Sequence, residues 1–209
     1  MTKSRLTLPK VLPYILLIGG AIGVFCSAIL TIEKMQLLKN PTAELACDLN
    51  PIIACGSVIG TPQASAFGFP NTIIGLVSFS VVATIGAAML AGARFKRWFW
   101  IGLQLGTIFG AGFITWLQYQ AIFRINALCP FCMVVWAVTI PIFLYSTLYN
   151  LREGHIRVAA RHKDFTDFLQ RHHGDILLVW YASFSQSSCI TFGITGVHCC
   201  SHTPTSRHS

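Results

Sequence analysis

The chain has 209 residues, of which 54% are hydrophobic and only 11% are charged, and its formal net charge is +8 at pH 7. A soluble domain carries about 25% charged residues, so this composition leaves too few ionic side chains to cover a water-facing surface. It therefore excludes an ordinary soluble domain. The positive charge requires no nucleic-acid partner, because the basic residues gather in the segments between long hydrophobic runs.

Four uncharged runs follow one another, at residues 11–32, 72–93, 98–123 and 125–151. Each is longer than the roughly 20 residues that an α-helix needs to cross the hydrocarbon core of a bilayer. The sequence predicts an all-α integral membrane protein in which residues 11–151 form a four-helix transmembrane bundle after an N-terminal tail at residues 1–10. The first run exceeds the apolar length of a signal peptide, so we expect it to remain as a membrane helix.

Basic residues indicate the orientation, since Lys and Arg favour the cytoplasmic side in short loops. The N-terminal tail and the connection at residues 94–97 contain basic residues and no acid, and the segment after residue 151 is rich in arginine. The long loop at about residues 33–71 has two lysines against three acids. We therefore expect a cytoplasmic N-terminus, with the loop and the turn at residues 124–130 on the extracytoplasmic face.

Residues 152–209 do not continue the pattern of complete spans. A basic segment is followed by an apolar start at residues 176–181, and from residue 182 the chain is rich in Ser, Thr, Cys and His. This predicts an incomplete fifth span and a polar tail. Within the four runs, glycines such as Gly20, Gly86, Gly102 and Gly106 occur at spacings that allow helices to approach closely.

Four of the eight cysteines fall on the predicted outer face: Cys47 and Cys55 in the loop, and Cys129 and Cys132 where the fourth run begins. The outer side is the oxidising side, where disulfides persist. The free N–H groups and the dipole at a helix start favour a thiolate, which is the nucleophile in disulfide exchange. The spacing therefore indicates a redox pair, although a four-thiolate zinc site or two structural disulfides fit the same residues.

The order of these motifs resembles a known family. The loop reads CDLNPIIACGSVIGTPQASAFGFPNTIIG over residues 47–75, and the fourth run opens with LCPFCMVVW at residues 128–136. The loop cysteine pair, the Pro-Asn pair before the second run and the Cys-X-X-Cys pair before the fourth resemble the bacterial branch of the vitamin K epoxide reductase family, over residues 11 to about 181. The resemblance implies a four-helix bundle around a quinone, capped by the outer loop, in a bacterial plasma membrane.

The resemblance also implies a role for each of the four cysteines. Cys132 corresponds to the cysteine that reduces the quinone, and Cys129 to its disulfide partner. Cys55 corresponds to the loop cysteine that meets Cys129. Cys47 corresponds to the outer shuttle cysteine, which exchanges with a partner protein.

Further residues match the quinone-binding positions of the family. Asn71 corresponds to the residue that hydrogen-bonds a quinone carbonyl, and the aromatic residues implied at the pocket are Trp136, Phe67 and Phe69. Thr61 stands where a hydroxyl group assists the Cys-X-X-Cys pair. From position alone, Asn71 also suits a cap of the second helix, and Trp136 also suits the membrane interface.

The activity implied is that of a membrane thiol:quinone oxidoreductase that drives disulfide-bond formation. It would oxidise a secreted or periplasmic DsbA-like thioredoxin-fold partner through the two cysteine pairs. The electron acceptor would be a quinone of the menaquinone, ubiquinone or vitamin K type, with no metal. Because residues 152–209 contain no thioredoxin-like pattern, we expect the partner to be a separate protein. The alternative is a membrane zinc-binding or structural cysteine protein without turnover.

Overall fold

The fold is built from membrane-length helices. The computed structural model describes residues 8–40, 45, 48, 55–156, 168–169 and 171–192. In this part of the chain every regular element is a helix. Four segments are long and apolar enough to cross a membrane, namely α1 (Leu8–Lys39), α3 (Asn71–Leu90), α4 (Arg97–Gln120) with the π-helical turn η2 (Ala121–Ile125), and α5 (Pro130–Arg152). The predicted all-α, multi-pass membrane fold is confirmed.

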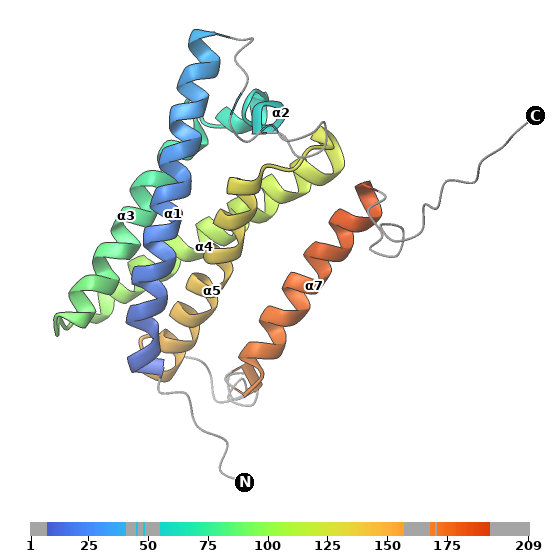
Figure 1. Ribbon diagram of the computed structural model, residues 1–209. Coiled ribbons are helices and arrows are strands. Elements are labelled where there is room, and N and C mark those ends of the chain that lie inside the picture. Colours follow the sequence, from blue (N-terminus) through green and yellow to red (C-terminus); the bar gives the residue numbers. More distant parts are fainter. Residues whose placement is uncertain are drawn as a thin grey trace, which may run out of the picture.

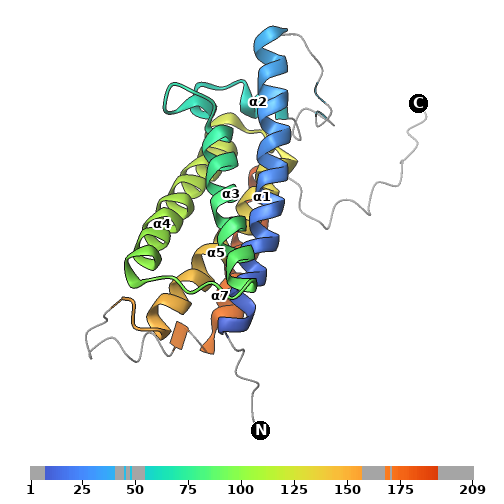
Figure 2. The same cartoon turned by 90° about the vertical axis from the view of Figure 1, so that its left-hand side faces the viewer.

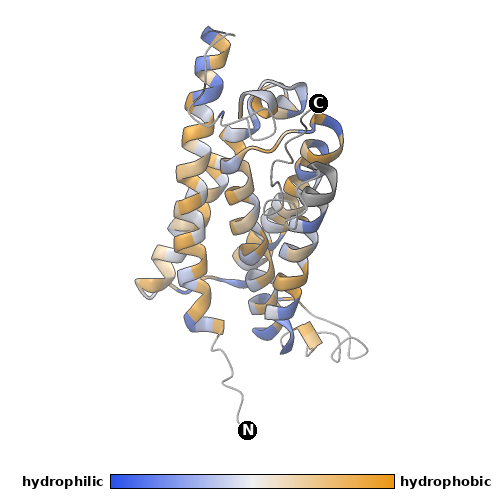
Figure 3. Cartoon of the chain, turned by 45° about the vertical axis from the view of Figure 1, so that its right-hand side comes forward, coloured by the Kyte–Doolittle hydropathy of each residue, from blue (hydrophilic) through white to orange (hydrophobic). Residues whose placement is uncertain are grey.

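Helix α1 is the central element of the bundle. It packs along α3 on one side and along α5 on the other, and α4 packs against α5 (Figures 1 and 2). Helices α3 and α4 are joined by a short connection at residues 91–96, and an apolar cavity lies between them. Hydrophobic residues occupy most of the length of these helices, and hydrophilic ones gather near their ends (Figure 3). This distribution fits helices that cross a bilayer.

The tightest packing joins α1 to α3 at two glycines. A Cβ atom added at Gly20 would lie 2.6 Å from the backbone nitrogen of Ala83, and one added at Gly86 would lie 2.4 Å from that of Leu17. Neither backbone leaves room for a larger residue. Small residues at these positions let the two helices touch backbone to backbone, which is a main source of helix association in membranes.

Helix α1 is longer than the first hydrophobic run predicts. The outer loop was expected to begin at residue 33, but α1 continues to Lys39, and the side chains of Glu33 and Lys34 are both buried. The charges end the apolar run without ending the helix. A tertiary contact explains the longer helix, because Lys34 donates a hydrogen bond to the carbonyl of Ile59 in the outer-loop segment.

The predicted fifth span forms a longer helix than its hydropathy indicates. Helix α7 (His173–Phe192) continues well past Tyr181, although it is not among the four membrane-length apolar helices. Its apolar residues pack on the bundle, with Trp180 and Phe184 beside Trp136, and the Tyr181 hydroxyl donates to the carbonyl of Ala137 at 2.5 Å. Contacts with α5 therefore stabilise α7, although the polar composition of its second half is unfavourable for a membrane helix.

Two short helices lie at the end of the bundle where α3 and α5 begin. They are α2 (Cys55–Ile59) and the 3-10 helix η1 (Pro62–Ser65) (Figure 1). Helix α2 contacts α1 and η2, and η1 contacts the start of α3. The described part of the predicted outer loop therefore covers this end of the bundle and lies beside the start of α5.

Candidate redox site and apolar cavity

The Cys-X-X-Cys pair lies at the first turn of α5. Asn126 has a left-handed φ of 54°, which ends η2 and turns the chain back toward the bundle. Cys129 is the N-cap residue, Pro130 follows at the first helical position, and the Cys129 sulfur accepts a hydrogen bond from the backbone N–H of Cys132 at 3.4 Å. Proline suits this position because it has no N–H to leave unpaired. The local sequence thus places a sulfur where the helix start offers N–H donors.

A loop cysteine touches this pair. Cys55 is the first residue of α2, and its Sγ lies 3.2 Å from the Sγ of Cys129, with both side chains fully buried. Cys55 is disulfide-bonded, whereas Cys129 and Cys132 are free. Cys47, the remaining predicted member of the set, lies outside the described residues. A free thiol in contact with a disulfide sulfur is the starting geometry for thiol–disulfide exchange.

The surroundings of Cys129 favour its thiolate. The pKa of Cys129 is lowered from the usual thiol value, above all by the hydrogen bond that the Cys132 side chain donates, and further by the backbone N–H groups of Cys132 and Phe131. Burial and the carboxyl group of Glu33 oppose this shift in the pKa. Cys129 is therefore the sulfur that the site prepares as a nucleophile.

This hydrogen bond predicts a difference between two variants of Cys132. Neither Cys132→Ser nor Cys132→Ala has the thiol that would resolve a Cys55–Cys129 disulfide, but only serine keeps a hydroxyl donor. Since the thiolate is the reactive form, a lower pKa of Cys129 lets exchange persist at lower pH. The rate of Cys55–Cys129 disulfide formation, followed by acid quenching and peptide mapping, should have its inflection at lower pH in Cys132→Ser. Identical profiles would contradict this role of the donor.

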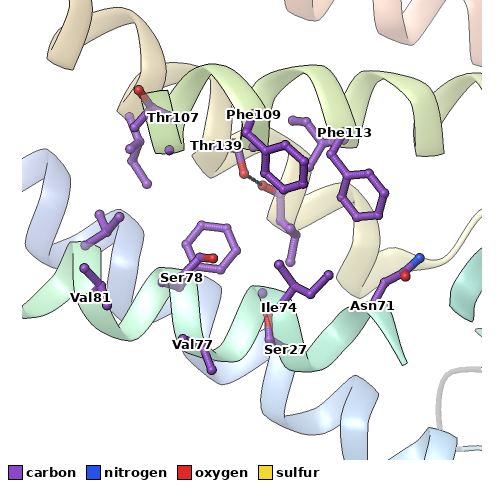
Figure 4. Close-up of a pocket in the computed structure, with 18 of the residues that line it drawn as sticks. Ser27, Asn71, Ile74, Val77, Ser78, Val81, Thr107, Phe109, Phe113 and Thr139 are labelled. Carbon is purple, nitrogen blue, oxygen red and sulfur yellow. Dashed lines mark hydrogen bonds between the residues drawn. The ribbon is translucent and has the colours of Figure 1, made fainter. Parts of the chain in front are cut away.

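An apolar cavity of about 500 Å³ lies on the other side of the pair. It runs between α3 and α4, with α5 and α1 behind it, and Cys132, Asn71 and Trp136 line it. Figure 4 shows Asn71 at one end of the row of lining residues, with Phe109 and Phe113 of α4 opposite α3. Cys129 thus contacts the loop cysteine, while Cys132 faces the cavity.

The Asn71 side chain makes two structural hydrogen bonds, and one of its N–H groups is not needed for them. Its Nδ2 donates to the carbonyl of Gln63 at 2.7 Å, and its Oδ1 accepts from the backbone N–H of Ala66 at 3.1 Å. Asn71 therefore holds η1 over the start of α3, and the N-cap position of α3 belongs to Pro70. The amide nitrogen has two N–H groups, so one bond to Gln63 leaves the other for a ligand in the cavity.

The predicted aromatic residues divide into two groups. Trp136 is buried, lines the cavity and also packs edge-on against Phe184 of α7. Phe67 and Phe69 do not line the cavity and are 51% and 43% exposed. The Phe67 ring lies 5.5 Å from that of Phe113, so it covers a cavity wall from outside. Phe67 also lies 6.5 Å from Phe109 of α4, and Phe69 packs beside Phe67, so both rings lie outside the cavity and differ from the expected lining role.

Thr61 has a local partner. Its hydroxyl donates to the carbonyl of Val58 at 2.7 Å and so closes the turn between α2 and η1. The single hydroxyl proton is used in that bond. The geometry therefore assigns Thr61 to the shape of the turn, and it provides no direct support for assistance to Cys129 or Cys132.

Several cavity residues were not predicted from the sequence. Phe109 and Phe113 stack on each other with centroids 5.8 Å apart and form part of the α4 wall. Gly102, Gly106 and Gly110 also line the cavity instead of contacting a neighbouring helix closely. The spacing of four residues among these glycines marks one helix face. The glycine spacing predicted close packing of helices, but in the structure these small residues leave room for the cavity.

Comparison with known proteins agrees with this arrangement. Residues 14–147 match the model of the vitamin K epoxide reductase family, and they include Cys55, the two cysteines at the start of α5 and most of the cavity. No curated protein matches the chain. Proteins of this family are oxidoreductases that act with quinones. The chain therefore belongs to the vitamin K epoxide reductase family and is a multi-pass membrane redox protein of that type.

Proposed function

We propose that this protein is a thiol:quinone oxidoreductase that oxidises a thioredoxin-fold partner and reduces a membrane quinone, and so drives disulfide-bond formation. One observation carries the proposal. The disulfide-bonded Cys55 lies 3.2 Å from the free Cys129, whose neighbour Cys132 faces an apolar cavity. Three cysteines therefore form a continuous path for electrons from the outer loop to the apolar cavity.

The first step takes electrons from the partner. A dithiol of a secreted DsbA-like protein attacks a loop disulfide between Cys47 and Cys55, through a mixed disulfide with Cys47. The partner leaves as a disulfide. The loop keeps two electrons and two protons as a pair of thiols.

The second step moves these electrons into the bundle. The Cys55 thiolate attacks Cys129 of a Cys129–Cys132 disulfide, which breaks that bond and releases Cys132. Cys47 then attacks Cys55, which re-forms the loop disulfide and releases Cys129. A disulfide-bonded Cys55 beside free Cys129 and Cys132 is the state expected immediately after this step.

The third step uses the cavity. Cys129 and Cys132 return to a disulfide and give up two electrons and two protons, which convert a quinone into a quinol. The cavity suits such an acceptor, because ligand sites are largely apolar with a few placed polar groups. Cys132 is the reductant at the wall, the second N–H of Asn71 would bind a carbonyl oxygen, and Trp136 would pack against the ring.

The state of the cysteines favours exchange over the alternative of a zinc site. Zinc binds thiolates, and two sulfurs that share a tetrahedral zinc lie about 3.8 Å apart. Cys55 is in a disulfide, and its sulfur lies 3.2 Å from that of Cys129. This separation and this oxidation state suit sulfur–sulfur exchange.

The proposed location is a bacterial plasma membrane with the N-terminus in the cytoplasm. The distribution of basic residues supports this orientation. The ends of α1 and α5 nearest residues 8 and 152 lie together, opposite α2 (Figure 1). The cysteines would then face the extracytoplasmic side, where partner proteins are oxidised.

The shuttle role is tested with Cys47→Ala. We expect oxidation of a thioredoxin-fold partner to fall by at least about a hundredfold, because the first nucleophilic exchange is lost. Quinone reduction driven by a small dithiol should stay within about threefold of the wild-type rate, since such a reagent reaches the second pair without the shuttle. Both rates are measured as quinone absorbance in membranes.

The matched control is Cys26→Ala, which removes a buried free thiol of α1. It should leave both rates unchanged. Equal loss of partner-driven and dithiol-driven reduction in Cys47→Ala would argue against a shuttle.

A further inference from the structure

Helix α2 is too short to hold its own shape. It has five residues, Cys55–Ile59, and isolated helices shorter than about 12 residues are marginal in water. Nevertheless it presents Cys55 at 3.2 Å from Cys129. Contacts with other parts of the chain must therefore fix its position.

The first of these contacts is at its C-terminal end. The ammonium group of Lys34 donates a hydrogen bond to the Ile59 carbonyl at 2.5 Å, and the Lys34 side chain is only 8% exposed. The last carbonyls of a helix have no partner within it. Pro62, three residues after Ile59, has no N–H with which to close the turn. Lys34 thus satisfies a carbonyl that the local chain leaves open.

The same face of α1 packs against the cysteines. Leu30 and Leu37 lie one turn to either side of Lys34 and belong to the apolar cluster that contains Cys55 and Cys129. Residues three and four apart share a helix face. Lys34 is therefore rooted in the helix that also packs along α5, whose first turn carries Cys129.

A second contact holds the N-terminal end of α2. The Asp48 carboxylate accepts a hydrogen bond from the Gly56 N–H at 2.9 Å, and a Cβ atom at Gly56 would lie 2.9 Å from the other carboxylate oxygen. The short helix thus has a negative charge at its start and a positive charge at its end. Both charges complement the helix dipole.

We propose that Lys34 is a positioning residue for electron transfer: by binding the Ile59 carbonyl, it holds α2 so that Cys55 stays within exchange distance of Cys129. This inference rests on the proposed function. Asp48 belongs to the same predicted loop as the cysteine helix, whereas Lys34 belongs to α1 of the bundle. Lys34 therefore adds a charged hydrogen bond to the apolar contacts between the bundle and the helix that carries Cys55.

The position of Cys55 relative to Cys129 can be tested without quinone reduction, by measuring how fast the two cysteines form a disulfide. In the background Cys47→Ser/Cys132→Ser, a mild thiol oxidant can join Cys55 to Cys129 without a quinone. Adding Lys34→Met removes the charged donor, and we expect the joining rate to fall about tenfold, because a hydrogen bond from a charged group is lost and a buried carbonyl is left unpaired. Lys34→Arg should recover the parent rate to within about threefold, since it keeps a charged donor. Peptide mapping of the Cys55–Cys129 disulfide gives the rate.

The matched control is Lys39→Met, which removes an exposed lysine from the end of the same helix and should leave the rate unchanged. If Lys34→Met fails to fold, Lys34→Gln keeps a neutral donor and should give an intermediate rate. In the chain with all cysteines intact, Lys34→Met should lower kcat for thiol-driven quinone reduction and leave KM for quinone unchanged, because Lys34 is not part of the cavity wall.

The outcomes separate the two proposals. A joining rate unchanged in Lys34→Met or Lys34→Gln would overturn the positioning role, even where the wild-type chain reduces quinone. Failure of the arginine variant to recover the rate would also overturn it. Absence of thiol-driven quinone reduction in the wild-type chain would instead contradict the proposed function, whatever the joining rates are.

Discussion

Replacing Cys132 by alanine is expected to lower thiol-driven quinone reduction by about three orders of magnitude or more. Loss of a covalent catalytic group has effects of this size or larger. Of the two cysteines at the start of α5, Cys132 is the one that lines the cavity, while the fully buried Cys129 contacts Cys55. No other sulfur in the described part of the chain lines the cavity. Quinone absorbance in membranes, with a dithiol as reductant, measures the loss.

The same variant should accumulate an intermediate. Without Cys132, the Cys129 thiolate attacks Cys55 and the resulting disulfide has no thiol to resolve it toward the cavity. Peptide mapping under non-reducing conditions should find Cys55 joined to Cys129. Turnover at the wild-type rate in Cys132→Ala would exclude the assignment, and Cys26→Ala again serves as the control with an unchanged rate.

Two glycine substitutions in membrane-length helices should affect different properties, one the stability of the fold and the other quinone binding. A Cβ atom at Gly86 would lie 2.4 Å from the Leu17 nitrogen and 2.8 Å from the Pro13 carbonyl oxygen, whereas one at Gly106 would meet nothing within 4 Å. Gly86→Val should therefore force α1 away from α3 and destabilise the fold by roughly 2 to 3 kcal/mol, as overpacking does in cores. Gly106→Val should leave the fold intact.

Gly106 lines the cavity, so its valine variant should instead raise KM for quinone, by about tenfold. Thermal unfolding in detergent and quinone titration, performed on both variants, separate the two effects. A normally stable Gly86→Val protein would contradict the close approach of α1 to α3. A Gly106→Val protein with an unchanged KM would place the quinone somewhere other than this cavity.

Much of the fold could be predicted from hydropathy, because a bilayer demands long apolar helices. The four runs correspond to the four membrane-length helices. The errors lie where tertiary contacts override composition. The charged residues 33 and 34 ended the predicted first span. Helix α1 nevertheless continues to Lys39, because Lys34 donates a hydrogen bond to the Ile59 carbonyl. Helix α7 similarly continues past Tyr181, which is tied to α5 by its hydroxyl group.

The positions of several candidate site residues agree with the motifs that suggested them, while their roles stay predictions. Cys55, Cys129 and Cys132 come together as their order implied, and Asn71 and Trp136 line the cavity. Positions that depend on three-dimensional shape were not predictable. The exposed Phe67 and Phe69 differ from the expected lining role, because only the turn before α3 decides where their rings lie.

Other features of the site had no sequence signal of their own. Phe109 and Phe113 form part of the cavity wall, but aromatic residues are ordinary in a membrane helix. The binding of Ile59 by Lys34 joins residues 25 positions apart. No local sequence pattern predicts this hydrogen bond, since neither a lysine nor an isoleucine is unusual in its own segment.

Thiol:quinone oxidoreductase activity is tested by quinone reduction with the purified chain in lipid, where a reduced thioredoxin-fold protein is the sole electron donor. We expect one quinol for each partner disulfide, and no reaction when Cys132 is replaced. A wild-type chain that leaves the quinone oxidised while the partner stays reduced would contradict it, as would reduction that persists without Cys55, Cys129 and Cys132.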